Sequence, residues 1–534
     1  MVNQENLPFG LSDFENLRKQ KKIYVDKTDL IYELARLNDP LFLSRPRRFG
    51  KSLLLSTFES LFSRGIEFFE GLKIEKLWND KKFYKVIHLD FSTYSCINSE
   101  IFDNDISKYL KLFAAKNNIS LDYTDESFRA GDILKLIVDN SRENIVVLID
   151  EYDYPLTHCL EDNAKFNLFR DYLQEFFGAI KSVSGKLRFL FITGVGKFAK
   201  TSVFSQLNHL NDISLDGKYA TLLGYTEDEI HNYFGKYLTE ISKKLNLKEE
   251  LLYSNLKDYY DGYRMTVSSK CCVYNPWSIL NFLRKPEEGF KNYWYETGGA
   301  YPTLVTKYIK NLQKTPLAEL QKKVITEENL REFYDYFDVP AAGLLYQTGY
   351  LTIKEEYDNK LLINRLILCP PNLEVKSALA KLYLKQVRET PITADDETVA
   401  RTLYKDFENH NYEALITHLN IVLNTFGYDN KVAFADERNC RDFLDLALCV
   451  AGIKTTKEQI NSLGRADLVV ELDRYRFVFE FKLSKDNDDE KLLKEAEDQL
   501  NKQKYGQILP IKKIIKIALV VNAKAKSITK WSVT

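Results

Sequence analysis

The sequence predicts an α/β protein, with a parallel sheet in its N-terminal part, a helical region after it and a smaller α/β domain at the C-terminal end. Apolar strand-like runs recur in the first 225 residues, at 41–44, 86–91, 145–149, 187–193 and 219–223. Segments long enough for helices separate most of these runs, for example residues 52–62 and 166–182. Strands that alternate with helices form parallel sheets covered on both faces.

Length and composition are those of a multidomain globular protein. The chain has 534 residues, which at ~150 residues per domain suggests three to four domains. Hydrophobic residues make up 45% and charged residues 28%, so apolar material for several cores is present. The net charge of −1 argues against a protein that coats nucleic acid through bulk positive charge, but not against a local basic patch.

Targeting features point to the cell interior. The first residues, MVNQEN, lack the basic end and apolar core of a secretory signal. No apolar run approaches the ~18 residues that a membrane span needs. Seven cysteines, an odd number without a CxxC pair, favour a reducing compartment over a disulfide framework or a zinc site. We therefore expect a soluble cytoplasmic protein without a membrane partner.

The pattern changes after the first 225 residues. From about residue 226 to 310 it becomes helical, and Thr226 followed by three acidic residues is typical of a capped first turn. A mixed stretch follows at 344–353, and Pro370-Pro371 is expected to break the chain. These changes predict a core at residues 1–225, a helical and connecting region at 226–370, and a C-terminal domain at 371–534 that begins with a helical linker.

Residues 44–52 read SRPRRFGKS and directly follow an apolar run. A strand, a phosphate-binding loop and a helix in this order form a P-loop. Gly50 would allow close backbone approach to phosphate, Lys51 would reach the β- and γ-phosphates, and the Ser52 hydroxyl would ligate Mg²⁺. Arg45 stands where the GxxxxGK[ST] motif usually has its first glycine. A basic turn that caps a helix is the alternative for this segment, and Arg48 either contacts phosphate or is solvated.

A matching acidic pair follows further along, where residues 145–151 read IVVLIDE. Five consecutive aliphatic residues suit a strand buried on both faces, and open α/β sheets bind ligands at the carboxyl ends of such strands. We expect Asp150 to hold Mg²⁺ and Glu151 to polarise the attacking water. Thr193 ends another predicted strand, where it either senses the γ-phosphate or simply closes the strand.

Further motifs accompany these two. They are LPFGLSDF at 7–14, YVDKT at 24–28, DEYD at 150–153, YDGYR at 260–264, YNPW at 274–277 and LYQTGY at 345–350. Together with RPRRFGKS they are similar to the hallmarks of the prokaryotic AAA-ATPase-like proteins, a family that characteristically has arginine in place of the first P-loop glycine. The resemblance implies an ATPase whose sheet is followed by a helical lid. In that lid, Arg264 is a candidate for reaching nucleotide in cis or in trans, the latter in a homo-oligomer.

Residues 464–483 read GRADLVVELDRYRFVFEFKL, in which two apolar-rich runs flank Asp473-Arg474. This pattern predicts a β-hairpin. If Leu472 pairs with Tyr475, the antiparallel register brings two acidic residues of the two strands directly opposite each other, with Cβ atoms ~5 Å apart. A one-residue bulge would break this register.

The two acids are Asp467 and Glu480, and strand alternation places Lys482 on the same face as Glu480. Two carboxylates can hold Mg²⁺, while a lysine beside them can orient water and stabilise developing phosphate charge. Phosphodiester cleavage needs this chemistry. A cross-strand ion pair on a half-exposed hairpin is the alternative.

The hairpin resembles the PD-(D/E)XK nuclease superfamily, specifically the small nuclease-like domain that commonly follows the ATPase family above. The resemblance implies Asp467 as metal ligand, Glu480 as second acid and Lys482 as catalytic lysine. It also implies residues from two neighbouring helices: Glu437, or alternatively Asp442, from the helix before, and Gln499 with Tyr505 from the segment after. The superfamily also contains members that do not cleave.

The sequence thus predicts a P-loop ATPase with a helical lid, followed by a small α/β nuclease-like domain. ATP and Mg²⁺ are the expected cofactors, and DNA or RNA is the expected partner and substrate. The alternative function is an NTP-dependent regulatory switch, whose nuclease-like domain binds a nucleic acid or protein partner without cleaving it. An ATPase that remodels or transports protein partners is a third hypothesis.

Overall fold

The computed structural model describes the chain in two compact units. Most of the chain up to Pro371 forms the first, and Asn372–Thr534 belongs to the second. The described residues are 4–121, 128–160, 162–196, 203–204, 207, 209–296, 323–327, 330, 341–357, 365–388, 402–425, 436–461, 464–472, 474–486, 488–502 and 512–534.

A five-stranded parallel sheet lies at the centre of the first unit. Its strands are β1 (Leu41–Ser44), β2 (Lys85–Asp90), β3 (Ile145–Asp150), β4 (Leu187–Gly194) and β5 (Asn211–Asp212). Their order in the sheet is β2-β3-β4-β1-β5, and every neighbouring pair is parallel. The predicted parallel sheet is confirmed. Because β4 lies between β1 and β3, the carboxyl ends of these three strands meet at one edge.

The prediction of a strand at residues 219–223 was wrong. The chain there forms turns, which begin with a 3-10 turn at Gly217–Tyr219. The fifth strand is instead β5, which has two polar residues and therefore no apolar signal. Its pairing with β1 comes from backbone hydrogen bonds, in which the Asn211 N–H donates to Pro40 (2.8 Å) and the Ile213 N–H to Phe42 (3.0 Å).

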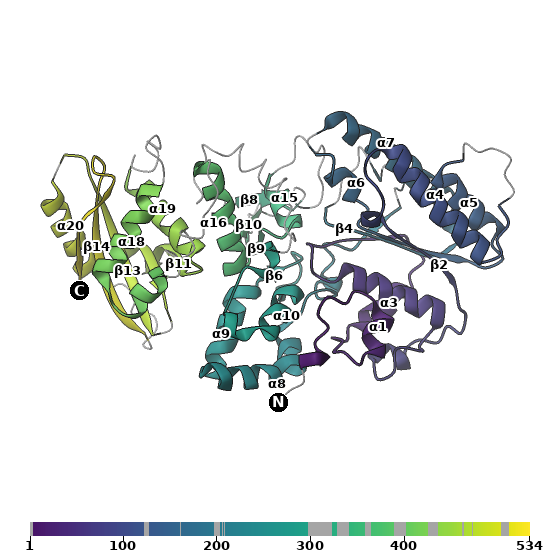
Figure 1. The fold of residues 1–534 in the computed structure, drawn as a ribbon, viewed down its shortest axis with the longest axis horizontal. Helices are drawn as coiled ribbons and strands as arrows, with labels where there is room; N and C mark the ends of the chain where they lie inside the picture. Colours follow the sequence, from purple (N-terminus) through teal and green to yellow (C-terminus); the bar gives the residue numbers. More distant parts are fainter. Residues whose placement is uncertain are drawn as a thin grey trace. The chain divides into compact units, whose positions relative to one another are not determined.

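Helices cover both faces of this sheet (Figure 1). One face carries α1 (Phe14–Lys19) and α3 (Lys51–Arg64), and the other carries α4 (Ser99–Lys116), α5 (Ala130–Asn140) and α7 (Asn163–Val183). The short helices α2 (Thr28–Ala35) and α6 (Tyr154–Thr157) complete this part. Phe58 of α3 packs on Phe189 and Phe191 of β4, with ring centroids 5.0 and 5.1 Å away. This packing fixes the helix that the P-loop precedes.

The helical pattern predicted for residues 226–310 is confirmed over the described part, residues 226–296, which also contains one short hairpin; residues 297–310 lie outside the described residues. Its helices are α8 (Glu227–Leu245), α9 (Glu249–Tyr260), α10 (Pro276–Arg284) and α11 (Tyr293–Glu296), and the hairpin consists of β6 (Tyr263–Arg264) and β7 (Cys272–Val273). The predicted cap of α8 is present. The Thr226 side chain accepts from the Glu229 N–H (3.2 Å), and the Glu229 carboxylate accepts from the Thr226 N–H (2.8 Å).

A small antiparallel sheet completes the first unit. Its order is β8-β10-β9, with β8 (Lys323–Thr326), β9 (Thr352–Tyr357) and β10 (Arg365–Cys369), and α15 (Ala341–Gln347) precedes β9. The expected mixed stretch at 344–353 therefore spans the end of a helix, a turn and the start of a strand.

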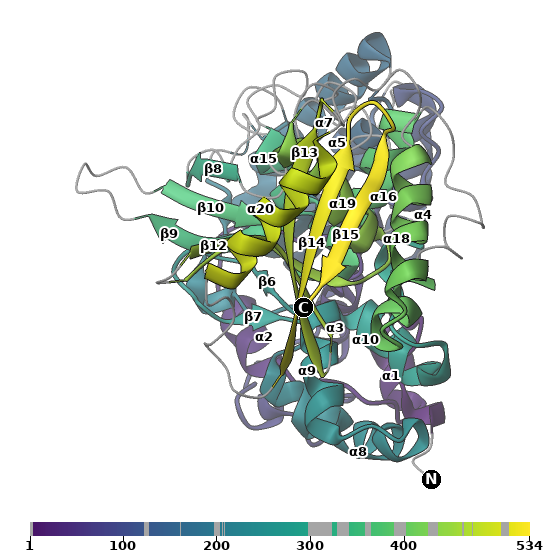
Figure 2. The same cartoon turned by 90° about the vertical axis from the view of Figure 1, so that its left-hand side faces the viewer.

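The second unit is a five-stranded mixed sheet in sequential order, with helices on both faces (Figures 1 and 2). Its strands are β11 (Lys454–Asn461), β12 (Gly464–Glu471), β13 (Tyr475–Ser484), β14 (Lys513–Asn522) and β15 (Ser527–Val533), and its helices are α16 (Leu373–Arg388), α18 (Tyr412–Thr425), α19 (Glu437–Val450) and α20 (Asp489–Lys502). Only β13 and β14 pair in parallel. Ala496 and Leu500 of α20 pack against Val469 and Val478. The predicted hairpin is β12–β13.

Candidate active sites

The loop between β1 and α3 curves around the side chain of Lys51. The Lys51 ammonium donates to the backbone carbonyls of Arg45 (3.0 Å) and Pro46 (3.2 Å). Burial lowers the pKa of Lys51, while the nearby carboxylates of Glu151 and Asp150 act in the opposite direction. A buried ammonium inside a loop of this shape lies where phosphate oxygens would replace the two carbonyls.

Two residues of this loop have a left-handed backbone. Gly50, which caps α3, has φ +98°, and Arg48 has φ +70°. Glycine adopts this conformation without steric cost, and here it lets the first N–H groups of α3 face the loop interior. Helix N-termini of this kind bind phosphate groups. Arg48 adopts the conformation at an energetic cost, which is typical of functional loops.

Arg45 has a structural role that the sequence did not assign. Its buried guanidinium donates to the carbonyls of Ser44 (2.9 Å), Ser214 (2.7 Å) and Tyr219 (3.2 Å). Burial lowers the Arg45 pKa to about 10. These bonds fasten the P-loop to the segment after β5, and they also hold the turn at Tyr219 that replaces the expected strand.

The carboxyl ends of β3 and β4 bring Asp150 and Thr193 together. The Thr193 hydroxyl donates to Asp150 Oδ1, which also accepts the Glu151 N–H (3.0 Å). Both side chains are buried, Asp150 at 1% exposure and Thr193 at 0%. The contact gives a role to the threonine next to the last residue of β4: it fixes the orientation of the aspartate that was predicted to bind metal.

Glu151 follows Asp150 with a left-handed backbone, at φ +48°. Its side chain lines the same cavity as Lys51 and Ser52. Burial raises the pKa of Glu151, whereas Lys51 and Arg47 lower it. A carboxylate whose proton affinity is raised is suited to accept a proton from water.

A cavity of about 590 Å³ adjoins the P-loop. Residues Arg47–Leu54 line it together with Ser92, Glu151 and Tyr154, and the other lining residues lie within 8–17, 23–31, 222–225 and 276–280. The volume lies in the range of small-molecule sites. The motifs at 7–14 and 24–28 therefore line the candidate nucleotide site. Residue patterns alone gave them no role, because they lie far from the P-loop in the sequence.

Arg48 links the P-loop to the lid. Its guanidinium lies 4.4 Å from the ring centroid of Trp277 in α10, and the Trp277 and Phe9 rings are 4.9 Å apart. The Arg284 guanidinium lies 4.7 Å from the centroid of the Phe9 ring. Arg48 and Trp277 both line the cavity, so a predicted phosphate-contacting arginine rests on a lid aromatic residue.

The hairpin of the second unit has the predicted register. Leu468 pairs with Phe479, and the next three pairs follow without a shift, which places Asp467 opposite Glu480 when the ladder is continued by one residue. Asp467 Oδ2 accepts the Phe481 N–H (3.0 Å). The Lys482 ammonium lies 3.5 Å from Glu480 Oε1. The two strands thus bring the two acids and the lysine to one face.

Glu480 is the most deeply buried acid of this group, at 1% exposure. Burial raises its pKa to about 8, Asp467 acts in the same direction, and Lys482 opposes both. Its Oε2 atom has no hydrogen-bond partner among the described residues. A buried carboxylate oxygen without a partner is costly, so the residues present fit a cation at this position.

Helix α19 adds three charged residues to the group. Glu437, its first residue, lies 3.8 Å from the Lys482 ammonium and accepts the Leu483 N–H (3.4 Å). One turn later, the Arg441 guanidinium lies 3.3 Å from Asp442 Oδ1 and 3.9 Å from Asp467 Oδ1. Both acids were predicted from the sequence, whereas Arg441 was not, although its position four residues after Glu437 is a signal for a shared helix face.

The comparisons with known proteins agree with this geometry. Residues 8–204 match the family described as predicted AAA-ATPase, and residues 435–531 match the PD-(D/E)XK nuclease superfamily. The chain joins an AAA-ATPase-like domain to a PD-(D/E)XK nuclease-like domain. Both resemblances predicted from the motifs are thereby confirmed, and so is the fold class.

One relative is similar to the chain over most of its length. It is the "Uncharacterized protein in vnfD 5'region" of Azotobacter chroococcum mcd 1, which is 28% identical over 494 residues, 90% of each chain. No solved structure matches the chain.

In the lid that follows the AAA-ATPase-like domain, Arg264 has partners that differ from the expected ones. Its buried guanidinium donates to the carbonyls of Ser269 (2.7 Å) and Val267, and it forms an ion pair with Glu356. Arg264 lines a small separate cavity of about 30 Å³ rather than the large one. Arg264 thus holds the β6–β7 hairpin to β9. The small cavity that it lines also contains Arg45 and Pro46 of the P-loop, but Arg264 does not line the larger cavity beside Lys51.

Two residues expected in the nuclease-like site have less definite positions. Gln499 is half-buried on α20, next to Leu500, which packs against the sheet. Tyr505 lies outside the described residues. Within the described ranges, no three His, Cys, Asp or Glu side chains are grouped closely enough to hold a metal by themselves. Of the helices that the structure describes, none has both the length and the apolar character of a membrane span.

Proposed function

We propose that the AAA-ATPase-like domain binds and hydrolyses ATP, and that the nuclease-like domain uses Mg²⁺ to cleave DNA or RNA. The observation that carries the first part is the cavity that Lys51, Ser52 and Glu151 line together. In this proposal residues 1–225 are the ATPase core, 226–370 are the lid and connecting region, and 371–534 are the nuclease-like domain. Its expected compartment is the cytoplasm.

In the ATPase site, each residue acts on the phosphate end of the nucleotide. Ser52 and Asp150 would hold Mg²⁺, which supplies charge neutralisation at the transferred phosphoryl group. Lys51 leaves its two backbone carbonyls and donates to phosphate oxygens. Glu151 orients the attacking water and accepts its proton. Thr193 holds Asp150 in the orientation that its hydroxyl already fixes.

In the nuclease-like site, Asp467 and Glu480 would hold the metal, and Glu480 Oε2 is the oxygen that lacks another partner among the described residues. The ion would polarise the scissile phosphate. Lys482 orients the attacking water beside it. Glu437 lies next to that lysine, where it fixes the ammonium or contributes a further oxygen ligand.

A cleavage assay tests the proposal. The purified full chain is incubated with single- and double-stranded DNA and RNA, with Mg²⁺ or Mn²⁺, in the presence and absence of ATP. We expect metal-dependent cleavage of at least one substrate, and we expect Asp467→Asn to remove it. If no substrate is cut under any of these conditions while ATP is hydrolysed, the nuclease part of the proposal is wrong.

The switch is the second candidate, and one observation favours it. The acids of the nuclease-like site already have cationic partners, Lys482 for Glu480 and Glu437, and Arg441 for Asp467. A charge-balanced group of this kind can bind a partner without cleaving it. In that case, binding of nucleotide would change the affinity of the nuclease-like domain for nucleic acid or protein. Neither the wild type nor Asp467→Asn would cleave nucleic acid.

A further inference from the structure

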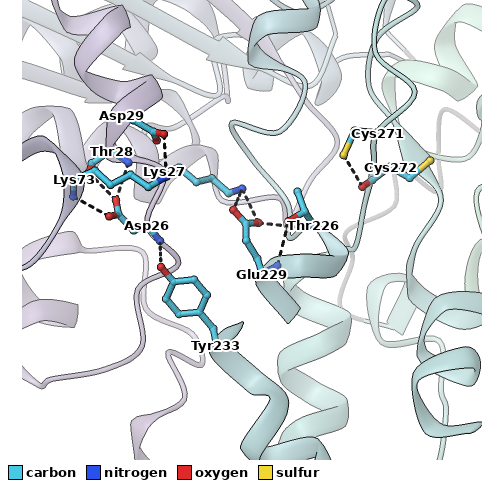
Figure 3. Close-up of polar contacts among 10 residues, drawn as sticks. All are labelled: Asp26, Lys27, Thr28, Asp29, Lys73, Thr226, Glu229, Tyr233, Cys271 and Cys272. Carbon is cyan, nitrogen blue, oxygen red and sulfur yellow. Dashed lines mark hydrogen bonds and ion pairs between the residues drawn. The ribbon is translucent and has the colours of Figure 1, made fainter. Parts of the chain in front are cut away.

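The motif at residues 24–28 forms a connection between two parts of the first unit (Figure 3). On the core side, the Asp26 carboxylate accepts the Thr28 N–H (2.9 Å), the Thr28 hydroxyl (2.6 Å) and the Lys73 N–H (2.9 Å). The Thr28 hydroxyl oxygen in turn accepts the Ile74 N–H (3.0 Å). These bonds fasten the segment to the chain that follows α3.

On the lid side, the same segment holds the start of α8. The Lys27 ammonium contacts both carboxylate oxygens of Glu229, each at 2.8 Å, and the Asp26 N–H donates to the Tyr233 hydroxyl (3.1 Å) (Figure 3). Glu229 also caps the helix through the Thr226 N–H. A single carboxylate therefore fixes the first turn of α8 both to its own cap and to the core.

The Lys27–Glu229 ion pair is largely buried, with side-chain exposures of 10% and 20%. Removing one partner of a buried pair leaves the other charge uncompensated, so the pair strongly favours one arrangement of its two elements. Lys27 lines the nucleotide cavity, whereas Glu229 does not. A nucleotide in the cavity could therefore touch Lys27 but not Glu229, although the two residues form one ion pair.

The cap of α8 directly follows a wall of that cavity. Residues 222–225 line it, and the next residue is Thr226, the N-cap that Glu229 bonds. A displacement of the first turn of α8 would displace this wall. The position of the wall therefore depends on the ion pair.

We propose that the Lys27–Glu229 pair holds the lid wall of the cavity in its nucleotide-binding position, and that Lys27 is a positioning residue for ATP. The inference rests on the proposed ATP site. Breaking the pair lets the start of α8 move, and residues 222–225 then fit the nucleotide less closely. The chemical step depends on Lys51 of α3 and on Glu151 after β3, which the pair does not hold, so the pair acts on affinity rather than on turnover.

The test compares Lys27→Met with Glu229→Gln in the full chain, by titration with a non-hydrolysable ATP analogue and by steady-state ATP hydrolysis. We expect each variant to raise the Kd and the KM about tenfold, within the usual range of coupling between sites, and to change kcat less than about twofold. Glutamine preserves the capping box, so Glu229→Gln removes only the charge. Because Glu229 does not line the cavity, an effect of this variant on affinity cannot arise from a lost nucleotide contact.

Three further variants complete the design. The double variant, Lys27→Met with Glu229→Gln, has no unpaired buried charge, and we expect its Kd to rise no more than in either single variant. Lys27→Arg preserves the charge and should keep the Kd within about threefold, as a preserved ion pair would. Lys73→Met removes the exposed Lys73–Asp29 pair (2.9 Å) of the same region and should leave the Kd unchanged.

Two results would overturn the inference while ATP binding by the wild type stands: a Glu229→Gln variant with wild-type affinity, or a double variant whose effects simply add. If Lys27→Met does not fold, Glu229→Gln and the double variant still give the answer. Absence of ATP binding by the wild-type chain would instead overturn the proposed function, and this inference with it.

Discussion

The two candidate sites differ in what their cations contact. In the AAA-ATPase-like domain, Lys51 donates to two neutral backbone carbonyls. In the nuclease-like domain, Lys482 and Arg441 lie against the acids. An incoming phosphate at the first site replaces neutral partners, whereas a metal at the second must share its ligands with cations. Under the proposed function, we therefore expect the first site to accept an anionic ligand without rearranging charged partners, and the second to bind metal and phosphate together.

The largest effect is expected at the first site. Lys51→Ala removes the cation that would contact the phosphates, and ATP hydrolysis should fall at least about a thousandfold. A coupled assay of phosphate release measures the loss, with the exposed helix residue Lys108 changed to alanine as a control. Hydrolysis at the wild-type rate in Lys51→Ala would show that this cavity is not the ATP site.

Glu151→Gln separates binding from chemistry at the same site. The amide cannot accept a proton from water, so hydrolysis should fall by about two to three orders of magnitude. Affinity for ATP should stay within about twofold, because Lys51 and the loop backbone are unchanged. Equilibrium titration and turnover of the same preparation measure the two quantities. A parallel loss of both would assign Glu151 a binding role.

Lys482→Ala tests the nuclease-like site, and ATP hydrolysis by the same variant serves as the comparison. Cleavage of nucleic acid should fall about a hundredfold, because the lysine beside the two acids is lost, while ATP hydrolysis should be unchanged. The matched control is Lys491→Ala, an exposed lysine of the following helix. Unaltered cleavage in Lys482→Ala would favour the switch, or place the chemistry elsewhere.

Arg45→Met should act on stability rather than on chemistry. The variant leaves the carbonyls of Ser214 and Tyr219 without their donor, which should lower the free energy of unfolding by about 2 kcal/mol. Chemical denaturation measures the change, and Arg142→Ala at an exposed turn is the control. A stability equal to that of the wild type would mean that Arg45 does not fasten the loop.

The smallest effect concerns Arg441. Its guanidinium lies 3.9 Å from Asp467, so Arg441→Gln should strengthen Mn²⁺ binding at the nuclease-like site about fivefold in the absence of nucleic acid. Titration calorimetry without nucleotide measures this affinity, and Arg438→Gln on the exposed side of the same helix is the control. Weaker Mn²⁺ binding in Arg441→Gln would mean that the arginine supports the metal site instead of competing with it.

The sequence predicted the parts of both sites that depend on local pattern. The aliphatic run at 145–149 identifies β3 and hence the position of Asp150, and the ladder rule places Asp467 opposite Glu480 because a register shift would reverse every side chain. The register is confirmed by the pairing of Leu468 with Phe479. Local pattern suffices where neighbouring residues alone determine the geometry.

The remaining parts depend on contacts between distant segments. Two polar residues, Asn211 and Asp212, form β5 only because β1 offers its backbone groups. Arg264 resembles a nucleotide-contacting arginine, but Glu356, far along the chain, binds its guanidinium. The cavity wall from residues 8–12 likewise has no local signal. Such features are determined by tertiary packing, which residue patterns do not contain.

Calorimetric titration of the full chain with a non-hydrolysable ATP analogue and Mg²⁺ is the most direct test of the central claim, that the cavity next to the P-loop is a nucleotide site. The account predicts one bound nucleotide per chain for the wild type and for Asp467→Asn, and none for Lys51→Ala. Equal binding by the wild type and Lys51→Ala, or no binding by the wild type, would contradict it.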